Sequence, residues 1–208
     1  MEKQLIIPEP KPITEIKEYE YAGREDITSV VILNSITKIG MWAFSNCTSL
    51  AEITIPNSVT EIEEFAFFCC EALTSVTIPD SVTVIRQNVF EGCTGLKEII
   101  IPNSVTEIEF MAFCDCESLT TVNIPESVTK IAGNAFECCT GLKAVAIPEA
   151  VTVMEDAFID CPNLTVLLSK NSKLQDGVFK GCKEVIRVDN PAAELEKIKK
   201  TLKNKNYE

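Results

Sequence analysis

Ten cysteines are the residues of this 208-residue chain with the clearest capacity for chemistry, and no histidine accompanies them. Thiolates can bind zinc, act as nucleophiles or pair as disulfides. The absence of histidine excludes Ser-His-Asp and Cys-His catalysis, histidine-ligated zinc and pH sensing by imidazole. Seven of the cysteines each follow a phenylalanine by three residues, and they are Cys47, Cys70, Cys93, Cys116, Cys139, Cys161 and Cys182.

The spacing of these cysteines follows a repeat that covers most of the chain. Residues 50–72 read LAEITIPNSVTEIEEFAFFCCEA, and the shared pattern is L-x-x-I-x-I-P-x-S-V-T-x-I-x-x-x-A-F-x-x-C-x-x. Self-similarity at a fixed period of this length predicts a solenoid of stacked units. The seven copies occupy 27–49, 50–72, 73–95, 96–118, 119–141, 142–163 and 164–184, of which the first is looser and the last two are shortened.

Each copy predicts a short strand, a turn and a second short strand. Apolar residues at Leu50, Ile53 and Ile55 favour a strand with one buried face, and Pro56 ends its pairing because proline has no N–H to donate. Val59-Thr60-Glu61-Ile62 is again alternating and β-branched. One copy cannot bury its apolar residues alone, so we expect neighbouring copies to bury them in continuous ladders.

The two ends of the solenoid are predicted to be capped. Residues 1–26 contain Ile13-Thr14-Glu15-Ile16 and Tyr21, which match the repeat loosely and indicate a degenerate N-terminal cap. Residues 27–188 form the seven repeats and a final strand. Residues 189–208 are a capping helix and tail, because Asp189-Asn190-Pro191 starts a helix whose Leu195, Ile198 and Leu202 share one face. A basic, partner-binding helix is the alternative interpretation.

Composition and charge narrow the class of partner. The chain is 46% hydrophobic and 24% charged, as in folded proteins, and its formal net charge is −12. This charge disfavours nucleic acid as a partner. The first residues have no apolar segment of a secretory signal, and no apolar run reaches the roughly 18 residues of a membrane-spanning helix, so we expect no membrane insertion.

The motifs L-x-x-I-x-I-P, V-T-x-I, A-F and C, at this spacing over residues 27–188, resemble the BspA-like leucine-rich repeats of bacterial surface proteins. The resemblance implies a β-rich, right-handed curved solenoid with a parallel sheet on its concave face and short strands and turns on the others. It also implies non-enzymatic binding or adhesion at the cell surface or outside the cell. The glycine that follows the V-T-x-I motif in the family is present here only as Gly40, and the last repeat lacks Ile-Pro.

The repeat also changes what the cysteines predict. Strands in a sheet lie about 4.8 Å apart, within reach of a disulfide, but side chains along a ladder run parallel, so we interpret the seven as buried thiols that bond weakly to turn carbonyls. A catalytic thiol would need a base and an electropositive setting, and neither is visible. Zinc prefers Cys-x-x-Cys pairs. We predict no metal and no cofactor, because the closely spaced cysteines are only Cys69-Cys70, Cys114-x-Cys116 and Cys138-Cys139.

Residues between the buried strand positions are expected to face the concave side and to form the binding surface. The early ones are small, polar or acidic, whereas the later ones are largely apolar and could form a binding patch. Two alternatives stay open for the apolar ones: they satisfy strand propensity, or the capping helix covers the last pair. The predicted surface comprises Glu52, Thr54, Ser75, Thr77, Glu98, Ile100, Thr121, Asn123, Ala144, Ala146, Val166 and Leu168.

Clustered carboxylates such as Glu61, Glu63 and Glu64 could be imagined as an acid/base pair, but they recur at outward positions and are interpreted as solvated surface. The sequence therefore predicts a monomeric, non-enzymatic module that binds a protein, or alternatively a glycan, through its concave face. The alternative function is a structural or self-assembling repeat segment of a larger cell-surface protein.

Overall fold

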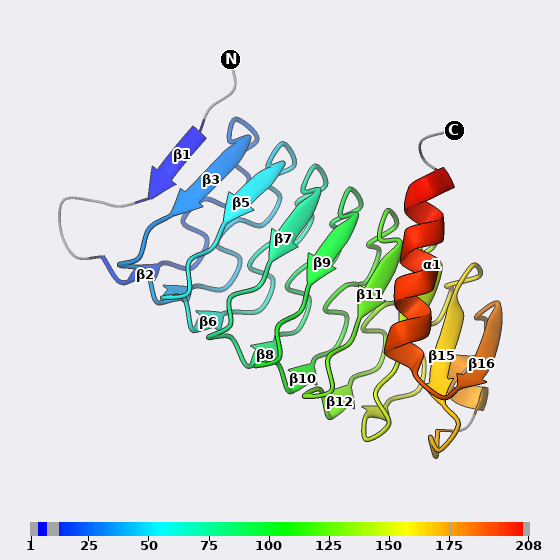
Figure 1. The fold of residues 1–208 in the computed structure, drawn as a ribbon. Coiled ribbons are helices and arrows are strands. Elements are labelled where there is room, and N and C mark those ends of the chain that lie inside the picture. Colours follow the sequence, from blue (N-terminus) through cyan, green and yellow to red (C-terminus); the bar gives the residue numbers. More distant parts are fainter. Residues whose placement is uncertain (1–3, 8–12, 175, 206–208) are drawn as a thin grey trace.

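The computed structural model describes residues 4–7, 13–174 and 176–205, and it is a parallel β-solenoid of about 8 turns (Figure 1). Most turns contribute one longer and one shorter strand. The longer strands are β1 (Gln4–Ile7), β3 (Ser29–Ile32), β5 (Glu52–Thr54), β7 (Ser75–Thr77), β9 (Glu98–Ile100), β11 (Thr121–Asn123), β13 (Ala144–Ala146), β15 (Thr165–Ser169) and β16 (Glu184–Val188). The shorter ones are β2 (Glu15–Ile16), β4 (Lys38–Ile39), β6 (Glu61–Ile62), β8 (Val84–Ile85), β10 (Glu107–Ile108), β12 (Lys130–Ile131) and β14 (Thr152–Val153).

All paired strands are parallel and successive turns lie side by side, as the fold prediction required. The longer strands form sheets of order β1-β3-β5-β7-β9 and β11-β13-β15-β16, and the shorter ones form sheets of order β2-β4-β6 and β8-β10-β12-β14. The register preserves the 23-residue period: Glu107 lies opposite Lys130, and Asn123 lies opposite Ala146. We call the outward side of the longer strands the sheet face.

Proline sets the length of the longer strands. In β5, β7, β9, β11 and β13 the Ile-Pro step follows closely, and each of these strands is 3 residues long. Leu33 replaces proline after β3, which has 4 residues, and the repeat that contains β15 lacks the Ile-Pro step, so β15 extends to 5 residues. Proline cannot donate to the ladder, and removing it lets the pairing continue.

Stacked phenylalanines fill the interior along the whole axis. Phe44 and Phe67 have ring centroids 5.5 Å apart and nearly parallel planes, and the stack continues turn by turn to Phe158. Tyr21 extends it at the N-terminal end, 5.3 Å from Phe44. The phenylalanines of the stack are fully buried, and each such side chain contributes on the order of 1.5–3 kcal/mol of hydrophobic stabilisation.

A corner of two left-handed residues in most turns drops each phenylalanine inside. Trp42 (φ 58°) and Asn46 (φ 57°) flank Phe44 at two residues on either side, and Asn134 and Cys138 flank Phe136 in the same way. Only glycine adopts a positive φ without cost, with asparagine and aspartate next. We call the surface formed by these corners, which follow the shorter strands, the turn ridge.

The N-terminal segment contains a strand that the sequence analysis missed. β1 pairs in parallel with β3, and Ile7 lies opposite Ile32. The predicted elements around Ile16 and Tyr21 are present, since β2 pairs with β4 and Tyr21 joins the ring stack. Residues 1–3 and 8–12 of the predicted cap lie outside the described residues. The N-terminal segment therefore contributes a longer strand, β1, as well as the shorter strand β2, whereas the motif match indicated only part of a solenoid turn.

The C-terminal segment forms the predicted last strand and helix, but the helix lies elsewhere than expected. After a short 3-10 helix, η1 (Asp176–Phe179), and strand β16, helix α1 spans Pro191–Lys205. The side-chain oxygen of Asn190 accepts a hydrogen bond from the Ala193 N–H at 2.9 Å, so the N-cap is as predicted. The helix does not cover the end of the stack: it lies across the sheet face over β13 and β15 (Figure 1). Tail residues 206–208 lie outside the described residues.

Candidate binding surface

The first eight residues of the predicted surface lie where the sequence placed them. They point outward from β5, β7, β9 and β11, and all are exposed except Thr121, which is half-buried. The parallel register aligns them in rows, with Ser75 opposite Glu98 and Thr77 opposite Ile100. Ile100 is 61% exposed, an unusual degree for a large apolar side chain. We call the outward residues of β3 to β11 the open half of the sheet face.

The prediction for Val166 and Leu168 is wrong, because both side chains point into the core and are fully buried. Val145 lies opposite Val166, so β15 is shifted by one residue relative to the repeat pattern. A one-residue shift moves every side chain of a strand to the other face. The outward residues of β15 are instead Thr165, Leu167 and Ser169. Thr165 and Leu167 lie opposite Ala144 and Ala146.

Helix α1 covers the apolar part of the predicted surface. Leu195 is 0% exposed and packs against Ala144, Ala146 and Leu167, with Ile198 beside it. Small outward residues on β13 leave room for the helix to approach the sheet. We call Ala144, Ala146 and Leu167 the covered half of the sheet face. The alternative that the helix covers the last pair is wrong, because Val166 and Leu168 lie in the core; α1 instead covers Ala144 and Ala146, which are inaccessible to a partner while it stays in place.

A hollow of about 470 Å³ lies in the open half, where β5, β7 and β9 end. Thr77 and Ile100 line it from the strands, and the turns after these strands contribute Asn57, Asp80 and Asn103. These turn residues are exposed and carry amide and carboxylate groups. Polar groups that converge beside an apolar side chain can orient a ligand that makes the apolar contact.

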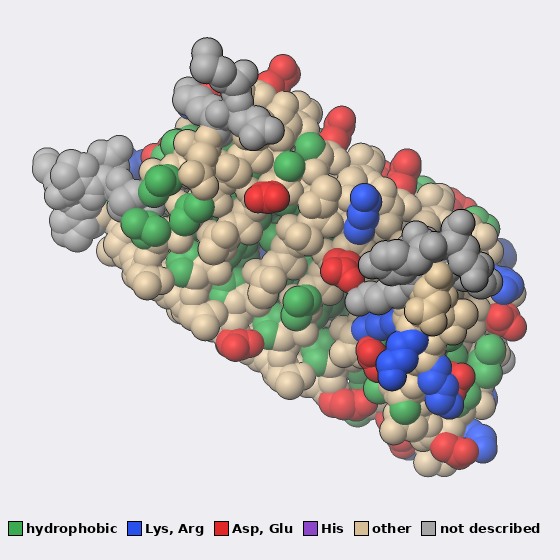
Figure 2. Space-filling model, turned by 45° about the horizontal axis from the view of Figure 1, so that its top comes forward, with side chains coloured by type: hydrophobic (Ala, Val, Ile, Leu, Met, Phe, Trp, Pro, Cys, Tyr) green, Lys and Arg blue, Asp and Glu red, His purple; other side chains and the backbone are tan. Residues whose placement is uncertain are grey.

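The charge of the sheet face differs along the solenoid. Lys and Arg side chains gather mostly at the α1 end of the face in Figure 2, whereas acidic and uncharged side chains predominate over the remainder. None of the outward strand residues of the open half is basic. On α1, Lys197 forms an ion pair with Glu194 at 2.8 Å and Lys199 forms one with Glu196 at 2.8 Å, both exposed. Basic groups of this helix are thus partly neutralised within it.

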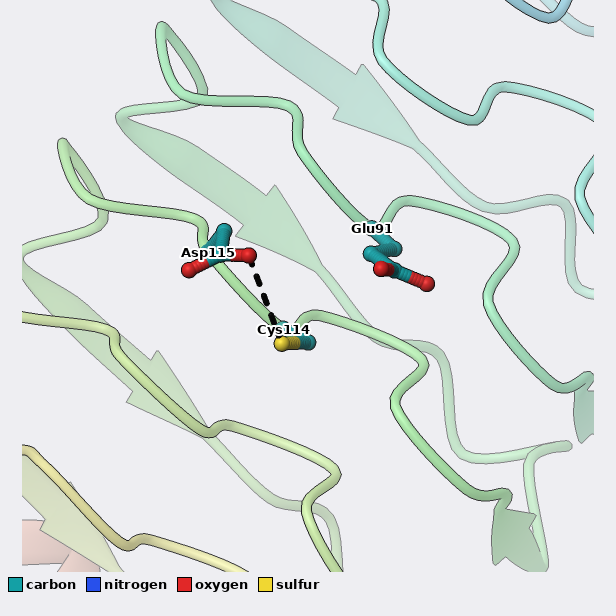
Figure 3. Close-up of side chains that lie close together, drawn as sticks. All are labelled: Glu91, Cys114 and Asp115. Atoms are coloured by element: carbon teal, nitrogen blue, oxygen red, sulfur yellow. Dashed lines mark hydrogen bonds between the residues drawn. The ribbon is translucent and has the colours of Figure 1, made fainter.

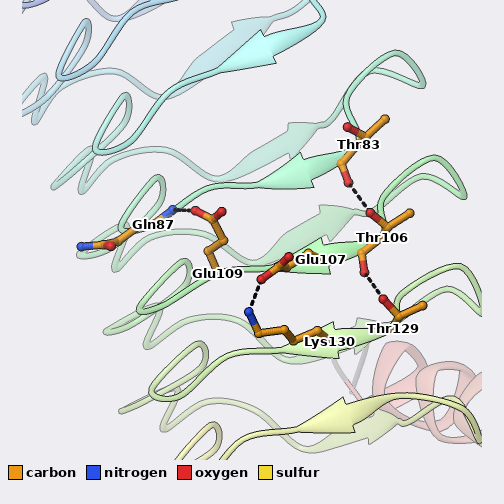
Figure 4. Close-up of polar contacts among 7 residues, drawn as sticks. All are labelled: Thr83, Gln87, Thr106, Glu107, Glu109, Thr129 and Lys130. Carbon is orange, nitrogen blue, oxygen red and sulfur yellow. Dashed lines mark hydrogen bonds and ion pairs between the residues drawn. The ribbon is translucent and has the colours of Figure 1, made fainter.

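The carboxylates near the shorter strands make local contacts. Lys38 forms ion pairs with Glu61 at 3.6 Å and Glu63 at 2.8 Å. In Figure 4, Lys130 pairs with Glu107, and Glu109 accepts a hydrogen bond from the Gln87 N–H at 2.9 Å. Beside them the Thr106 hydroxyl donates to the Thr83 carbonyl, and the Thr129 hydroxyl donates to the Thr106 carbonyl, as Figure 4 shows. These carboxylates therefore bind neighbouring turns together, in agreement with their interpretation as surface residues.

The seven ladder cysteines donate to backbone carbonyls of the preceding turn, as the sequence analysis expected. Cys47 Sγ donates to the Tyr21 carbonyl at 3.1 Å and Cys93 Sγ to the Phe67 carbonyl at 3.2 Å. All are free thiols. Burial raises the pKa of Cys47 to about 11 and that of Cys161 to about 12. They are therefore protonated at neutral pH and poorly nucleophilic.

Two clusters on the turn ridge escaped the sequence analysis. The first is an aromatic row in which Trp42 stacks between Tyr19 and Phe65, at centroid distances of 6.0 and 4.0 Å, with Phe68 edge-on to Phe65 and Trp42. Tyr19, Trp42 and Phe65 all have positive φ, which is costly for bulky residues, and their mutual stacking offsets this cost. The second cluster combines thiols with carboxylates. Both could have been found by aligning the repeats and reading down each column of the alignment.

Comparison with known proteins agrees with the repeat architecture. The model of the BspA type leucine rich repeat region matches in 6 copies, over residues 14–109 and 62–186. A T. pallidum leucine rich repeat protein of known crystal structure is 27% identical in sequence, with a TM-score of 0.57, and the match covers 96% of this chain and 82% of that one. A Eubacterium ventriosum leucine-rich repeat protein shares the fold at 22% identity and a TM-score of 0.58, over 71% of this chain and 46% of that one. No curated protein matches.

Among the helices in the described part of the chain, none has the length and apolar composition that crossing a bilayer requires.

The repeat matches span residues 14–186, which is most of the sequence. The chain therefore belongs to the BspA type leucine rich repeat family.

Proposed function

We propose that this protein is a non-enzymatic binding module that recognises its ligand through the open half of the sheet face. The observation that carries the proposal is the contrast between the two halves of this face. Helix α1 buries the covered half, whereas the open half keeps Ile100 61% exposed beside the hollow. A large exposed apolar side chain among polar groups favours an intermolecular contact.

The ligand class follows from the groups that surround the hollow. Ile100 offers an apolar contact, Asn57 and Asn103 offer amide donors and acceptors, and Asp80 offers a carboxylate. This combination suits a protein surface with polar or basic groups, and a glycan is the alternative because its hydroxyls bond amides and carboxylates equally. Nucleic acid is disfavoured, since the outward strand residues of the open half include no Lys or Arg to contact phosphates.

The residues available for binding are the eight predicted ones on β5, β7, β9 and β11, all of which belong to the open half. At the cell surface or outside the cell, the open half would be exposed to extracellular ligands, and the role of the protein would then be adhesion. We propose this location on family membership. No catalytic role is assigned to any residue of this surface.

The second candidate function, a structural or self-assembling segment of a larger surface protein, is favoured by the end of the stack. β16 is the last strand of its sheet, and its Ile186 is exposed. An end strand presents backbone groups that can pair with another chain. Light scattering over a range of concentrations separates the two: a constant monomer mass favours the binding module, and growing assemblies favour the structural segment.

The proposal is tested with the substitution Ile100→Glu. A panel of extracellular proteins and a glycan array are first screened with the unmodified chain, and the dissociation constant of each ligand is then measured with the variant. We expect a rise of at least about tenfold, because a central apolar contact is replaced by a charge. Phe110→Glu is the matched control, since Phe110 is also exposed and apolar but lies on the turn ridge. Unchanged affinity in Ile100→Glu, or equal loss in both variants, would contradict the proposal.

A further inference from the structure

The second cluster on the turn ridge consists of two parallel columns, each a thiol between two carboxylates. In the first column Cys114 lies between Glu91 and Glu137, each one turn of 23 residues away. In the neighbouring column Cys138 follows Asp115 by 23 residues and precedes Asp160 by 22. The two columns together, comprising Glu91, Cys114, Asp115, Glu137, Cys138 and Asp160, are called the ridge array.

The donor atoms of the ridge array fall into two groups, each compact enough to hold an ion. One atom each of Glu91, Cys114 and Asp115 lie within 4.8 Å of one another (Figure 3). Cys114 Sγ lies 3.6 Å from Asp115 Oδ2 and 3.9 Å from Glu137 Oε2. The atoms of Glu137, Cys138 and Asp160 form a second group within the same 4.8 Å limit. Three carboxylates thus surround the Cys114 thiol.

The backbone holds this arrangement in place. The Gly92 N–H donates to the Cys114 carbonyl and the Asp115 N–H donates to the Glu137 carbonyl, both at 2.9 Å. Asparagine side chains orient the carboxylates: Asn134 Nδ2 donates to Glu137 at 2.8 Å, and Asn88 Nδ2 donates to Glu91. The side-chain oxygen of Asn88, a residue only 4% exposed, has no hydrogen-bond partner in the structure. Hydrogen bonds from a second residue to the carboxylates, like those from Asn88 and Asn134, are typical of metal sites, where they hold the ligands in position.

The negative charge of the array is not neutralised by the protein. Within residues 4–7, 13–174 and 176–205, no Lys or Arg forms an ion pair with Glu91, Asp115, Glu137 or Asp160. Burial raises the pKa of the Cys114 thiol, and the charges of Asp115, Glu137 and Glu91 raise it further. Burial also raises the pKa of Glu91. A cation among these groups would remove the repulsion between them.

We propose that the ridge array binds one zinc ion through the Cys114 thiolate and the carboxylates of Glu91, Asp115 and Glu137. The sulfur ligand disfavours calcium and magnesium, which take oxygen ligands, and the three oxygens disfavour copper(I), which prefers soft sulfur ligands. Zinc accepts both, at about 2.3 Å to sulfur and 2.0–2.2 Å to oxygen in a tetrahedron. Glu91, Cys114 and Asp115 already have donor atoms within 4.8 Å of one another, whereas the Glu137 carboxylate, 3.9 Å from Cys114 Sγ, has to move closer to complete the tetrahedron. Formation of the Zn–S bond releases the Cys114 proton to solvent.

This proposal reverses the sequence-based expectation that no metal binds. That expectation rested on the absence of Cys-x-x-Cys pairs, which are ligands close together in sequence. Glu91 and Glu137 each lie 23 residues from Cys114, and they meet it only because consecutive turns stack.

The test uses the reduced, chelator-treated full chain and the metals alone. Zinc binding is measured by titration calorimetry, and cadmium serves as a second probe because thiolate–cadmium bonds give an ultraviolet charge-transfer band. We expect one ion per chain and a cadmium band. Cys114→Ser should abolish the band and weaken zinc binding by at least about tenfold, and Glu137→Gln, which keeps shape and thiol, should also weaken zinc binding by at least about tenfold.

Cys69→Ser is the matched control. Cys69 is a further ridge thiol in the column of Cys138, but its neighbours in that column are Asn46 and Gly92, which offer no carboxylate. Its substitution should leave both the band and the zinc affinity unchanged. Circular dichroism checks that each variant is folded. If Cys114→Ser does not fold, the zinc affinity of Glu137→Gln tests the proposal instead. No zinc binding, a band that survives in Cys114→Ser, a band lost in Cys69→Ser or unchanged zinc affinity in Glu137→Gln would each overturn the proposal.

Discussion

The open and covered halves of the sheet face are built from the same repeat and differ in what lies on them. Asn123 on β11 and Ala146 on β13 are directly opposite each other in adjacent strands, yet Asn123 is exposed and Ala146 is buried beneath α1. Nothing in the strand geometry distinguishes the two positions. The difference lies in the side chains: the covered half is small or apolar, whereas the open half is mostly polar. An apolar outward residue therefore indicates either a contact within the chain or one with a partner.

The comparison also explains why Ile100 is informative. Ala144, Ala146 and Leu167 are apolar and outward, and α1 accounts for all three. Ile100 is apolar and outward as well, but no element of the described chain buries it. The same physical reasoning that assigns the covered half to α1 assigns Ile100 to an external contact.

The largest expected effect comes from placing the same charge on both halves. Ala146→Glu should lower the free energy of unfolding by about 3 kcal/mol, because the side chain collides with α1 and its carboxylate is buried without a partner. Asn123→Glu, one strand away in the same row, should change the free energy by less than about 0.5 kcal/mol. Urea denaturation measures both. Equal effects in the two variants would mean that α1 does not cover the sheet in solution.

A somewhat smaller effect is expected from weakening the helix contact itself. Leu195→Ala removes a fully buried side chain of α1 and should cost about 2 kcal/mol, with increased binding of a hydrophobic dye to the uncovered residues. Lys200→Ala, on the exposed side of the same helix, is the control and should be nearly neutral. If the two variants have the same stability, the contact of α1 with the sheet contributes nothing measurable.

The smallest difference between the two halves is expected in the interior, where the cysteine ladder runs beneath both of them. The pKa values of Cys47 and Cys161 are raised by burial from 9.0 to about 11 and about 12. A raised pKa in the folded state stabilises the protein below pH 9, and this stabilisation is lost as the pH rises from about 9 through the folded-state pKa values. The free energy of unfolding should therefore fall over this range.

Cys47→Ser and Cys161→Ser compare the two halves in that experiment, because serine does not titrate there. Each should remove a similar part of the alkaline decline, measured by urea denaturation at a series of pH values. A decline that is unaffected by either substitution would show that other groups cause it.

The interior was predictable because each ladder repeats the same residue type. Phe44 and Phe67 occupy equivalent positions, and so do Cys47 and Cys70, so aligning the copies fixed the strands, the corners and the thiol contacts. Register failed only at β15. Val166, Leu167 and Leu168 are all apolar, so alternation could not show which of them point inward, and the shortened repeat removed the alignment that would have decided it.

The sequence by itself determined the solenoid, its parallel pairing and the outward positions of the open half, because a period of 23 residues leaves one way to stack the apolar ladders. Only the tertiary structure decided where α1 lies, since an amphipathic helix fits the end of a stack as well as an apolar sheet face. Aligned repeats place Glu91, Cys114 and Glu137 in one column, but only the structure shows how close their side chains come, with Cys114 Sγ 3.9 Å from Glu137 Oε2. Residues 23 positions apart are neighbours only once consecutive turns are in contact, and chemistry formed between turns is invisible along a single repeat.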